Sequence, residues 1–164
     1  MPHSFTTFAS PVGRLKLVAS DAGLVAILWE NDDPGRVRLG DMREDSAHPV
    51  LLQTAEELTE YFAGTRTVFT VPLDMVGTDF QCRVWAALLT IPFGQTRSYG
   101  HIARQVGSPK AFRAVGAANG RNPVSIITPC HRAIGANGTL TGFAGGLEAK
   151  QYLLALEARQ LALL

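Results

Sequence analysis

The residues with the clearest chemical potential lie in the segment Asn122–Arg132, which ends in Pro129-Cys130-His131-Arg132. Cysteine attacks as the thiolate, and a neighbouring histidine or positive charge lowers the thiol pKa toward neutrality. A buried, unreactive thiol beside a histidine would show the same pair of residues. A zinc site is a weaker interpretation, because the chain has only two cysteines, Cys82 and Cys130, without CxxC spacing, and no further ligands can be identified.

A carboxylate is predicted inside an apolar helix face near the C-terminus. The face of the helical pattern from residue 147 to about residue 161 is formed by Leu147, Leu153, Leu154 and Leu161. Glu157 projects within this face, about 40° from the nearest leucines, and burying a carboxylate is costly unless it is paired. Either the helix end frays and Glu157 reaches water, or Glu157 orients His131 and completes a Cys-His-carboxylate set with Cys130.

The elements that must position these residues begin with a small α/β domain, expected over residues 1–76. Short strands at residues 4–9, 14–20 and 24–30 are separated by turn formers and indicate an antiparallel meander. A helix is expected from about Pro49 to Phe62, because its apolar residues recur at helical spacing. Residues 67–73 predict a further strand that completes the domain.

Residues 77–164 read as a second, mainly helical domain. Thr78 and Gln81 form a capping box ahead of a helix that ends before Pro92, and we interpret Cys82 within it as a packing residue. A short helix from Tyr99 stops at Gly107.

A second short helix follows this glycine and runs to about Asn119, with Ser108 as its N-cap and Pro109 as its first residue. Two short helices joined by a tight turn are typical of a helix-turn-helix, although plain helix packing gives the same spacing.

The second of these short helices has a low surface made by Ala111, Ala114, Gly116, Ala117 and Ala118. Small residues permit close approach, either to another helix or to the walls of a narrow groove. Arg113 projects from this surface and favours insertion into a groove. Further along, glycines flank Phe143 in residues 139–146, as in a loop that closes on a flat ligand, although a plain glycine-rich connector fits too.

Charge is divided unevenly along the 164 residues, whose net charge is only +1. Residues 1–76 carry 6 Lys/Arg against 11 Asp/Glu, whereas residues 77–164 carry 9 against 3, so the basic half is the candidate for nucleic-acid contact. No apolar run is long enough to span a membrane, and the N-terminus lacks a signal-peptide layout. We therefore expect a cytoplasmic protein with free thiols.

Together these residues closely resemble the O6-alkylguanine-DNA alkyltransferases. The motifs that carry the resemblance are Tyr99-Gly100, Arg113–Asn119, Asn122-Pro123, Pro129–Arg132 and Gly142–Gly146. They cover roughly residues 78–160 in the family's order and spacing, and the absence of cysteine before residue 77 matches the bacterial, zinc-free branch. The resemblance implies a ribonuclease H-like N-terminal domain, with a small antiparallel sheet and a helix, followed by a mainly helical domain with a helix-turn-helix.

The family's activity would be direct repair of O6-alkylguanine, and of O4-alkylthymine, in duplex DNA. The flipped base would transfer its alkyl group irreversibly to Cys130, with no cofactor and no metal. His131 would be the general base, acting through a water, and Glu157 would hold its imidazole. Asn122 would brace the turn, and Tyr99 would hydrogen-bond a ring nitrogen of the leaving guanine. Since the thioether product cannot be displaced, each molecule would act once.

The same resemblance implies the contacts to base and duplex. Backbone groups of Ala133 and Ala144 would read the guanine edge, and Phe143 would pack on the base. The implied minor-groove residues are Lys110, Arg113, Ala114, Gly116, Ala117, Ala118 and Arg121, with Arg113 filling the gap left by the flipped nucleotide. Some relatives have Tyr and Ser at positions 143 and 144, so those hydroxyl contacts are lost here, and Leu140 and Ala144 would leave room for groups larger than methyl.

Two other functions stay open. One is a sensor that binds alkylated guanine and recruits repair factors, and the other is a cysteine hydrolase with turnover. Known sensors lack the acceptor cysteine, so Cys130 counts against the first. We expect a monomer that binds duplex DNA with little sequence preference, with cooperative binding left open.

Overall fold

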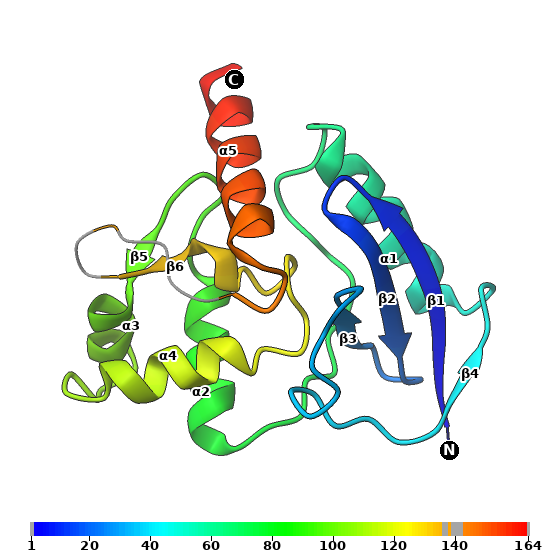
Figure 1. Ribbon diagram of the computed structural model, residues 1–164, viewed down its shortest axis with the longest axis horizontal. Helices are drawn as coiled ribbons and strands as arrows, with labels where there is room; N and C mark the ends of the chain where they lie inside the picture. The colour runs from blue at the N-terminus through cyan, green and yellow to red at the C-terminus, as the bar shows by residue number, and fades with distance from the viewer. Residues whose placement is uncertain (1, 136–137, 139–142, 164) are drawn as a thin grey trace.

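The N-terminal half is a sheet with a helix packed on one face (Figure 1). In the computed structural model, which describes residues 2–135, 138 and 143–163, the strands are β1 (His3–Ser10), β2 (Gly13–Ala19), β3 (Leu24–Leu28) and β4 (Met42–Glu44). Their order is β3-β2-β1-β4; the first three form the expected antiparallel meander, and β4 pairs with β1 in parallel. A strand as short as β4 shows no alternating pattern, so the sequence did not predict it.

The strand predicted at residues 67–73 is wrong. Only Leu73 makes a bridge, to Leu24, and the rest of the segment is irregular. Its backbone donors find a side chain instead of a neighbouring strand: the buried Glu57 carboxylate accepts from the N–H of Thr70 at 2.8 Å and of Val71 at 3.3 Å. A carboxylate that satisfies these groups removes the need for a ladder.

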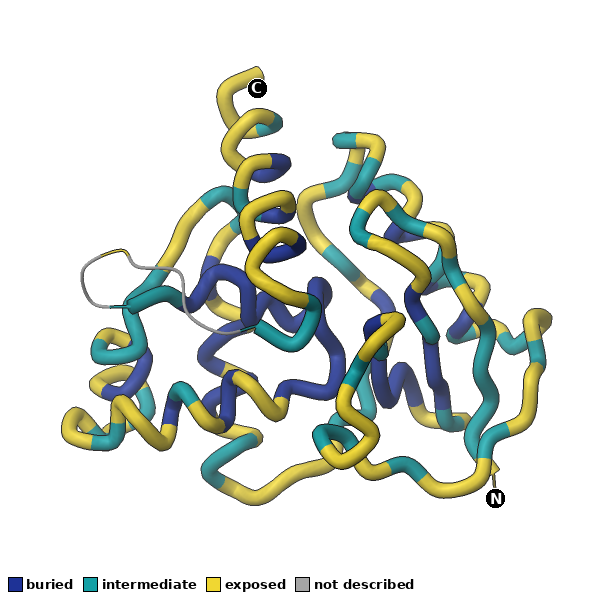
Figure 2. Tube along the Cα trace, in the orientation of Figure 1, coloured by how far each residue is buried: buried dark blue, intermediate teal, exposed yellow. Residues whose placement is uncertain are grey.

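Helix α1 (Pro49–Phe62) has the expected bounds, with proline in its first turn. It buries Leu51, Leu58 and Tyr61 in a core that also contains Leu153 and the apolar residues of the segment before Cys130, which are Val124, Ile126 and Ile127. The two halves of the chain therefore share one hydrophobic core, which runs across their junction (Figure 2).

The C-terminal half is mainly helical, as expected. Its elements are α2 (Asp79–Leu89), β5 (Arg97–Ser98), α3 (Tyr99–Gln105), α4 (Phe112–Gly120), the 3₁₀ turn η1 (Cys130–Arg132), β6 (Ala133–Ile134) and α5 (Leu147–Leu163). The capping box of Thr78 and Gln81 is present at the start of α2. Helices α2, α3 and α4 enclose a second core, and α3 and α4 form the helix-turn-helix (Figure 1). Among the described residues, no helix is long and apolar enough to cross a bilayer.

The start of α4 differs from the prediction. Ala111, not Ser108, occupies the N-cap, and no side chain caps the helix. Ser108 instead accepts the Ala111 N–H through its backbone carbonyl, at 2.8 Å, so Pro109 and Lys110 belong to the preceding turn. A serine before a proline begins a turn as readily as a helix.

Two packing predictions for the C-terminal half are also wrong. Cys82 is exposed on α2, with only a 3.8 Å contact from its sulfur to the Gly77 carbonyl. Leu147 and Leu161 are about half exposed, and the apolar residues that α5 buries are Ala149, Leu153 and Leu156. Lys150 and Glu157 on this helix are buried as well and bond Ala133 and Arg132, so α5 turns the face that carries these two charges inward.

We predict that Thr78→Ala lowers the free energy of unfolding by about 1 kcal/mol, because it removes the side-chain acceptor for the Gln81 N–H at the start of α2. Urea denaturation measures the change. Thr59→Ala is the control: Thr59 lies on an exposed face within α1 and bonds only the Ala55 carbonyl, so a change within about 0.5 kcal/mol is expected. Equal losses in the two variants would contradict the capping role.

Candidate active site

The segment from Asn122 to Arg132 is buried throughout and leads from α4 into η1. Asn122 holds it in shape: its Oδ1 accepts the Val124 N–H at 3.0 Å, and its Nδ2 donates to the Thr128 carbonyl at 2.8 Å. Ile126 adopts a left-handed backbone, φ 75°, which is costly for a β-branched residue. Such a conformation persists only where surrounding contacts enforce it.

Cys130 is buried at the first position of η1, with 3% of its surface exposed. Burial raises the pKa of its thiol, while hydrogen bonds from the side chains of Asn122 and Ser125 and the charges of Arg36 and Lys150 oppose that effect. The effect of burial on the pKa is larger than these opposing effects, so the resting thiol is protonated at neutral pH. Attack by the sulfur therefore requires a base.

Glu157 is the most heavily bonded side chain of the site. Its carboxylate accepts from His131 Nε2 at 2.7 Å, from Arg132 Nε and Nη2 at 2.8 and 2.9 Å, from the Tyr61 hydroxyl at 2.7 Å and from the Gly94 N–H at 3.2 Å. Burial alone would raise the pKa of Glu157, but His131 and Arg132 lower it well below the usual range. Glu157 is fully buried, so the frayed-end alternative is wrong.

His131 is also fully buried, and burial lowers its pKa despite the opposing effect of Glu157. An ionised carboxylate can only accept a hydrogen bond, so Nε2 carries the ring proton and its N–H donates a hydrogen bond to Glu157. Nδ1 is then the basic nitrogen, and it has no hydrogen-bond partner among the described residues. The imidazole is therefore neutral, fixed in one tautomer and able to take up a proton.

Arg132, Tyr61 and Lys150 are polar site residues that the sequence analysis did not assign. Arg132 clamps Glu157 and also donates to the Ile91 carbonyl at 2.7 Å; its position next to Cys130-His131 was the only signal for it. Tyr61 comes from α1, 96 residues from Glu157, and no local pattern marks it.

The buried Lys150 donates to the Ala133 carbonyl at 2.8 Å. Ala133 is buried as well, and its own N–H bonds the Cys130 carbonyl. Both backbone groups of Ala133 are thus already engaged within the protein, and only the second lone pair of its carbonyl is left for a ligand.

The residues expected to hold the flipped nucleobase pack around the same hydrophobic core as Cys130. Phe143 and Tyr99 are both partly buried against that core, and Tyr99 is the first residue of α3. Ala144 is partly buried next to Phe143. Leu140, which was expected to influence the size of the accepted alkyl group, falls outside the described residues.

Helix α4 presents part of the expected low surface. Arg113, Ala114 and Ala117 are exposed, Lys110 is exposed in the turn before the helix, and Gly116 faces open space. The prediction that Ala118 belongs to the DNA-contacting surface is wrong. Ala118 is 3% exposed and its carbonyl accepts from the Trp85 indole at 2.9 Å, so it packs inside the domain.

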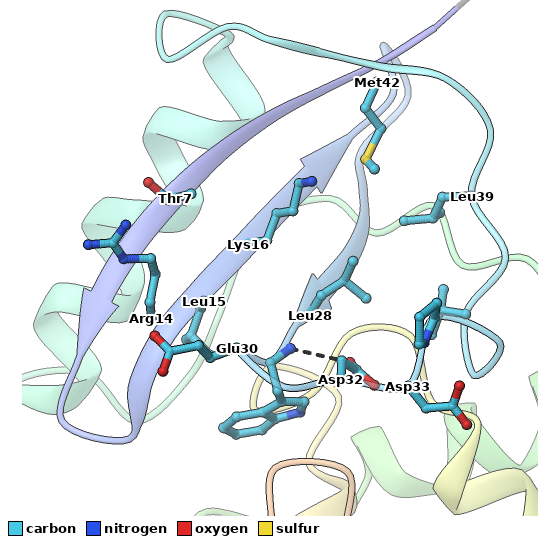
Figure 3. A pocket seen from close by; sticks show the side chains of 13 residues that line it. Thr7, Arg14, Leu15, Lys16, Leu28, Glu30, Asp32, Asp33, Leu39 and Met42 are labelled. Carbon is cyan, nitrogen blue, oxygen red and sulfur yellow. Dashed lines mark hydrogen bonds between the residues drawn. The ribbon is translucent and has the colours of Figure 1, made fainter.

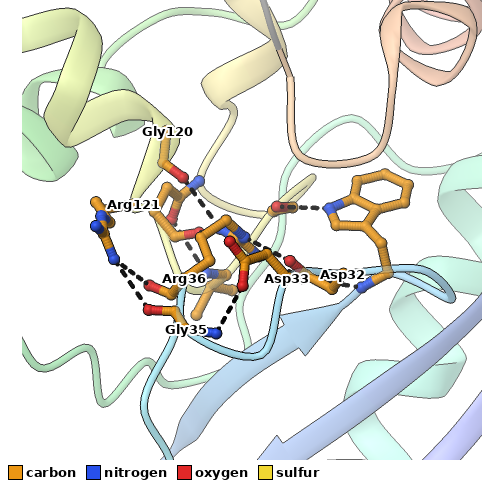
Figure 4. A network of polar contacts seen from close by, with 10 residues as sticks. Asp32, Asp33, Gly35, Arg36, Gly120 and Arg121 are labelled. Carbon is orange, nitrogen blue, oxygen red and sulfur yellow. Dashed lines mark hydrogen bonds and ion pairs between the residues drawn. The ribbon is translucent and has the colours of Figure 1, made fainter.

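Arg121, expected on the DNA side, is exposed but reaches the N-terminal half. It donates to the carbonyls of Gly35 and Arg36 at 3.0 and 3.3 Å (Figure 4).

A separate hollow of about 440 Å³ lies on the sheet side of the N-terminal half (Figure 3). Charged residues such as Arg14, Lys16 and Glu30 line it together with Leu28 and Met42, but no cysteine or histidine does. Within the described part of the chain, no group of three or more potential ligands could hold a metal. This hollow therefore lacks the thiol and the imidazole that adjoin each other at Cys130 and His131.

A buried thiol beside a histidine held by a carboxylate, in a half of the chain that carries a helix-turn-helix, is the arrangement of a DNA-binding protein that uses a cysteine. The family model for the 6-O-methylguanine DNA methyltransferase DNA-binding domain matches residues 79–159, and the model for the ribonuclease-like domain of the same proteins matches residues 4–75. The chain belongs to this family. It repairs alkylated DNA by transferring the alkyl group to a cysteine, the activity of a methylated-DNA–protein-cysteine methyltransferase.

Individual relatives match along nearly the whole chain. A methylated-DNA–protein-cysteine methyltransferase of Mycolicibacterium paratuberculosis is 49% identical over 155 residues, covering 94% of this chain and 92% of that protein. The corresponding protein of Methanosarcina acetivorans is 44% identical over 153 residues, covering 93% and 97%. The crystal structure of Mycobacterium tuberculosis OGT in complex with DNA has a TM-score of 0.88 at 47% identity, covering 96% of this chain and 94% of that one.

We predict that Glu157→Gln lowers the free energy of unfolding at neutral pH by about 3 kcal/mol, because it leaves Arg132 buried without its counter-charge. The folded-state pKa of Glu157 lies below its unfolded value of about 4.3. Its contribution to stability is therefore complete above that pH and is lost as the pH falls toward the folded pKa.

Urea denaturation at several pH values measures this effect. The difference between wild type and Glu157→Gln should shrink on acidification, and a constant difference would contradict the assignment. Glu60→Gln is the matched control, because Glu60 pairs with Arg66 at the surface at 2.8 Å and should cost no more than about 1 kcal/mol.

Proposed function

We propose that Cys130 is the alkyl acceptor and that His131 and Glu157 supply its base. The observation that carries this assignment is the geometry of His131. Its Nε2 lies 2.7 Å from a carboxylate oxygen of Glu157 and donates to it. Nδ1 is then a buried acceptor, without a partner among the described residues, on the residue next to Cys130. The other cysteine, Cys82, is exposed on α2, and its sulfur contacts the Gly77 carbonyl. In the described part of the chain, no histidine or carboxylate hydrogen-bonds this sulfur.

In the proposed reaction, the Cys130 proton passes to His131 Nδ1, directly or through a water, and the sulfur attacks the alkyl carbon of O6-alkylguanine. A carbon–sulfur bond forms as the carbon–oxygen bond breaks, and the electron pair leaves with the guanine oxygen. Glu157 stabilises the imidazolium that results. The thioether has no acidic proton and is a poor leaving group, so each molecule reacts once.

The leaving guanine also needs assistance, which Tyr99 would give by donating a hydrogen bond to a ring nitrogen. Phe143 would stack on the base, and backbone groups of Ala144, with the remaining lone pair of the Ala133 carbonyl, would read its edge. The same pocket would admit O4-alkylthymine. Asn122 would brace the turn through the hydrogen bonds described above.

The proposed DNA contact is through α4 in the minor groove. The exposed small residues Ala114, Gly116 and Ala117 permit close approach to the duplex, while Arg113 enters the stack and Lys110 contacts the backbone. Arg121 would stabilise the edge of this DNA-contacting surface through its hydrogen bonds to the carbonyls of Gly35 and Arg36. The similar Mycobacterium tuberculosis protein has been crystallised with DNA, which supports DNA as the partner. The proposed form is a monomer on a duplex.

The proposed domains are residues 1–76 and 77–164, and the proposed compartment is the cytosol, where thiols stay reduced. A lesion sensor would not require a cysteine with its own base, and a hydrolase would require a route for water to release the thioether. Stoichiometric transfer therefore explains the site better than either alternative.

We predict that incubation with duplex DNA containing O6-methylguanine adds one methyl group to the Cys130 peptide, seen by mass spectrometry, and that reaction stops at one equivalent. Cys130→Ala should abolish transfer and keep lesion binding. Cys82→Ala, the matched control at the exposed cysteine, should transfer normally. Turnover beyond one equivalent would indicate a hydrolase, and lesion binding without any adduct would indicate a sensor.

We also predict that Arg113→Ala slows repair of duplex DNA by about tenfold or more but slows reaction with free O6-alkylguanine base by less than about twofold, because only the duplex requires a base to be flipped. Single-turnover rates measure both reactions. Arg159→Ala, which removes an exposed charge on α5, should repair the duplex normally. Equal losses on duplex and free base would contradict the assignment of Arg113.

A further inference from the structure

Trp29 follows β3, at the point where the N-terminal domain meets the candidate active site. Its buried indole donates from Nε1 to the Ser125 hydroxyl oxygen at 3.1 Å. Its ring packs edge-on against Phe143, with ring centroids 5.3 Å apart, and a Cβ added at Gly145 would lie 2.6 Å from it. One side chain thus contacts both the turn that leads to Cys130 and the segment proposed to hold the base.

Ser125 lies in the same buried turn as Cys130, which folds back on itself through hydrogen bonds from the Thr128 N–H to the Val124 carbonyl at 3.0 Å and from the Cys130 N–H to the Thr128 carbonyl at 2.7 Å. Burial raises the pKa of Cys130, and hydrogen bonds from the side chains of Asn122 and Ser125 act against that effect. An indole N–H can only donate, and a serine hydroxyl has one proton of its own. Because the Ser125 oxygen accepts from Trp29, the Ser125 proton is free to be donated to the sulfur.

The loop after β3 carries a network of polar contacts around Asp32 and Arg36 (Figure 4). The Trp29 backbone N–H donates to Asp32 Oδ2 at 3.2 Å, and Asp32 pairs with Arg36 through two hydrogen bonds of 2.7 Å. Arg36 in turn donates to the Asn122 carbonyl at 2.7 Å. Residues 29–36 therefore hydrogen-bond to the turn before Cys130 at two residues, Asn122 and Ser125.

We propose that Trp29 is a positioning residue for alkyl transfer, whose indole N–H orients the Ser125 hydroxyl toward the Cys130 sulfur and whose ring supports Phe143. The proposal rests on the assignment of Cys130 as the acceptor. Trp29 acts through Ser125 and does not touch the reacting atoms. Two donors in series stabilise the thiolate more than an unoriented hydroxyl does, since hydrogen bonds in a chain polarise one another.

Other charged groups also act on this thiol. They are Lys150 on α5 and Arg36 in the β3–β4 loop. The charged groups next along the chain are His131 and Arg132, which lie in η1 and bond Glu157 on α5. A tryptophan-to-phenylalanine change alters none of these charges. A shift in the ionisation of Cys130 would therefore report the missing N–H.

The test is Trp29→Phe, which keeps an aromatic ring beside Phe143 and removes the donor. Single-turnover methylation of Cys130 by duplex DNA containing O6-methylguanine is measured against pH. The thiol inflection should rise by about half a pKa unit, the value of one modest hydrogen bond, with about threefold slower transfer at neutral pH. Ser125→Ala should shift it equally, and the double variant no further.

Trp85→Phe is the matched control. Trp85 is also buried and also donates from its indole, to the Ala118 carbonyl at 2.9 Å, so its loss should reduce stability without moving the inflection. An unmoved inflection in Trp29→Phe, with a raised one in Ser125→Ala, would overturn the proposal. A wild-type protein that acquires no adduct at Cys130 would instead refute the proposed function.

A second measurement leaves Trp29 intact. The chain has two tryptophans, so in Trp85→Phe protein the fluorescence comes from Trp29 alone. This emission should change with pH at the same midpoint as the transfer rate, and the change should vanish when Ser125→Ala is added. Emission that does not respond to pH across that midpoint would overturn the link between Trp29 and the thiol.

Discussion

The buried carboxylate of Glu157 is the interaction on which the rest of the structure depends. An ionised carboxylate in a protein interior is strongly unfavourable unless every lone pair is matched by a donor. Here the donors come from three segments of the chain: Tyr61 from α1, the backbone of Gly94 after α2, and His131 and Arg132 from η1. All of them meet Glu157 on α5. Satisfying one charge thus fixes the relative positions of elements from both halves.

This requirement also explains the chemistry of the site. A neutral histidine with one nitrogen committed to a carboxylate has its other nitrogen available as a base, and the burial that keeps the imidazole neutral also keeps the Cys130 thiol protonated until a substrate is present. The arrangement suits a protein whose thiol can be used only once. A thiolate exposed at rest would react with other electrophiles or be oxidised before it met a lesion.

The ribonuclease-like domain contributes to the candidate active site although it contains no cysteine. It shares a hydrophobic core with α5 and with Val124, Ile126 and Ile127, and the Ile27 N–H donates to the Pro123 carbonyl at 2.8 Å. Tyr61 and the Asp32–Arg36 pair reach the same region. The acidic half of the chain therefore packs against the turn before Cys130 and stabilises it. The basic half contains α4.

Much of the local structure could be predicted from short-range pattern. Helix α1 and the capping box of α2 follow from spacing and end chemistry, and Glu157 stood out because a carboxylate interrupted an apolar face. Predictions failed where a distant group replaced a local partner. The Glu57 carboxylate satisfied the backbone of the expected strand at residues 67–73, and Ala118 turned inward beneath Trp85.

The sequence by itself determined the chemical identity of this protein: a cysteine next to a histidine, a carboxylate on the final helix, and an arginine on a helix of small residues. Tertiary structure alone decided what surrounds them. Tyr61 and Glu157 are 96 residues apart, as are Trp29 and Ser125. Such pairs are selected by the packing of two halves against each other, and that packing leaves no periodicity or spacing in the chain from which they could be read.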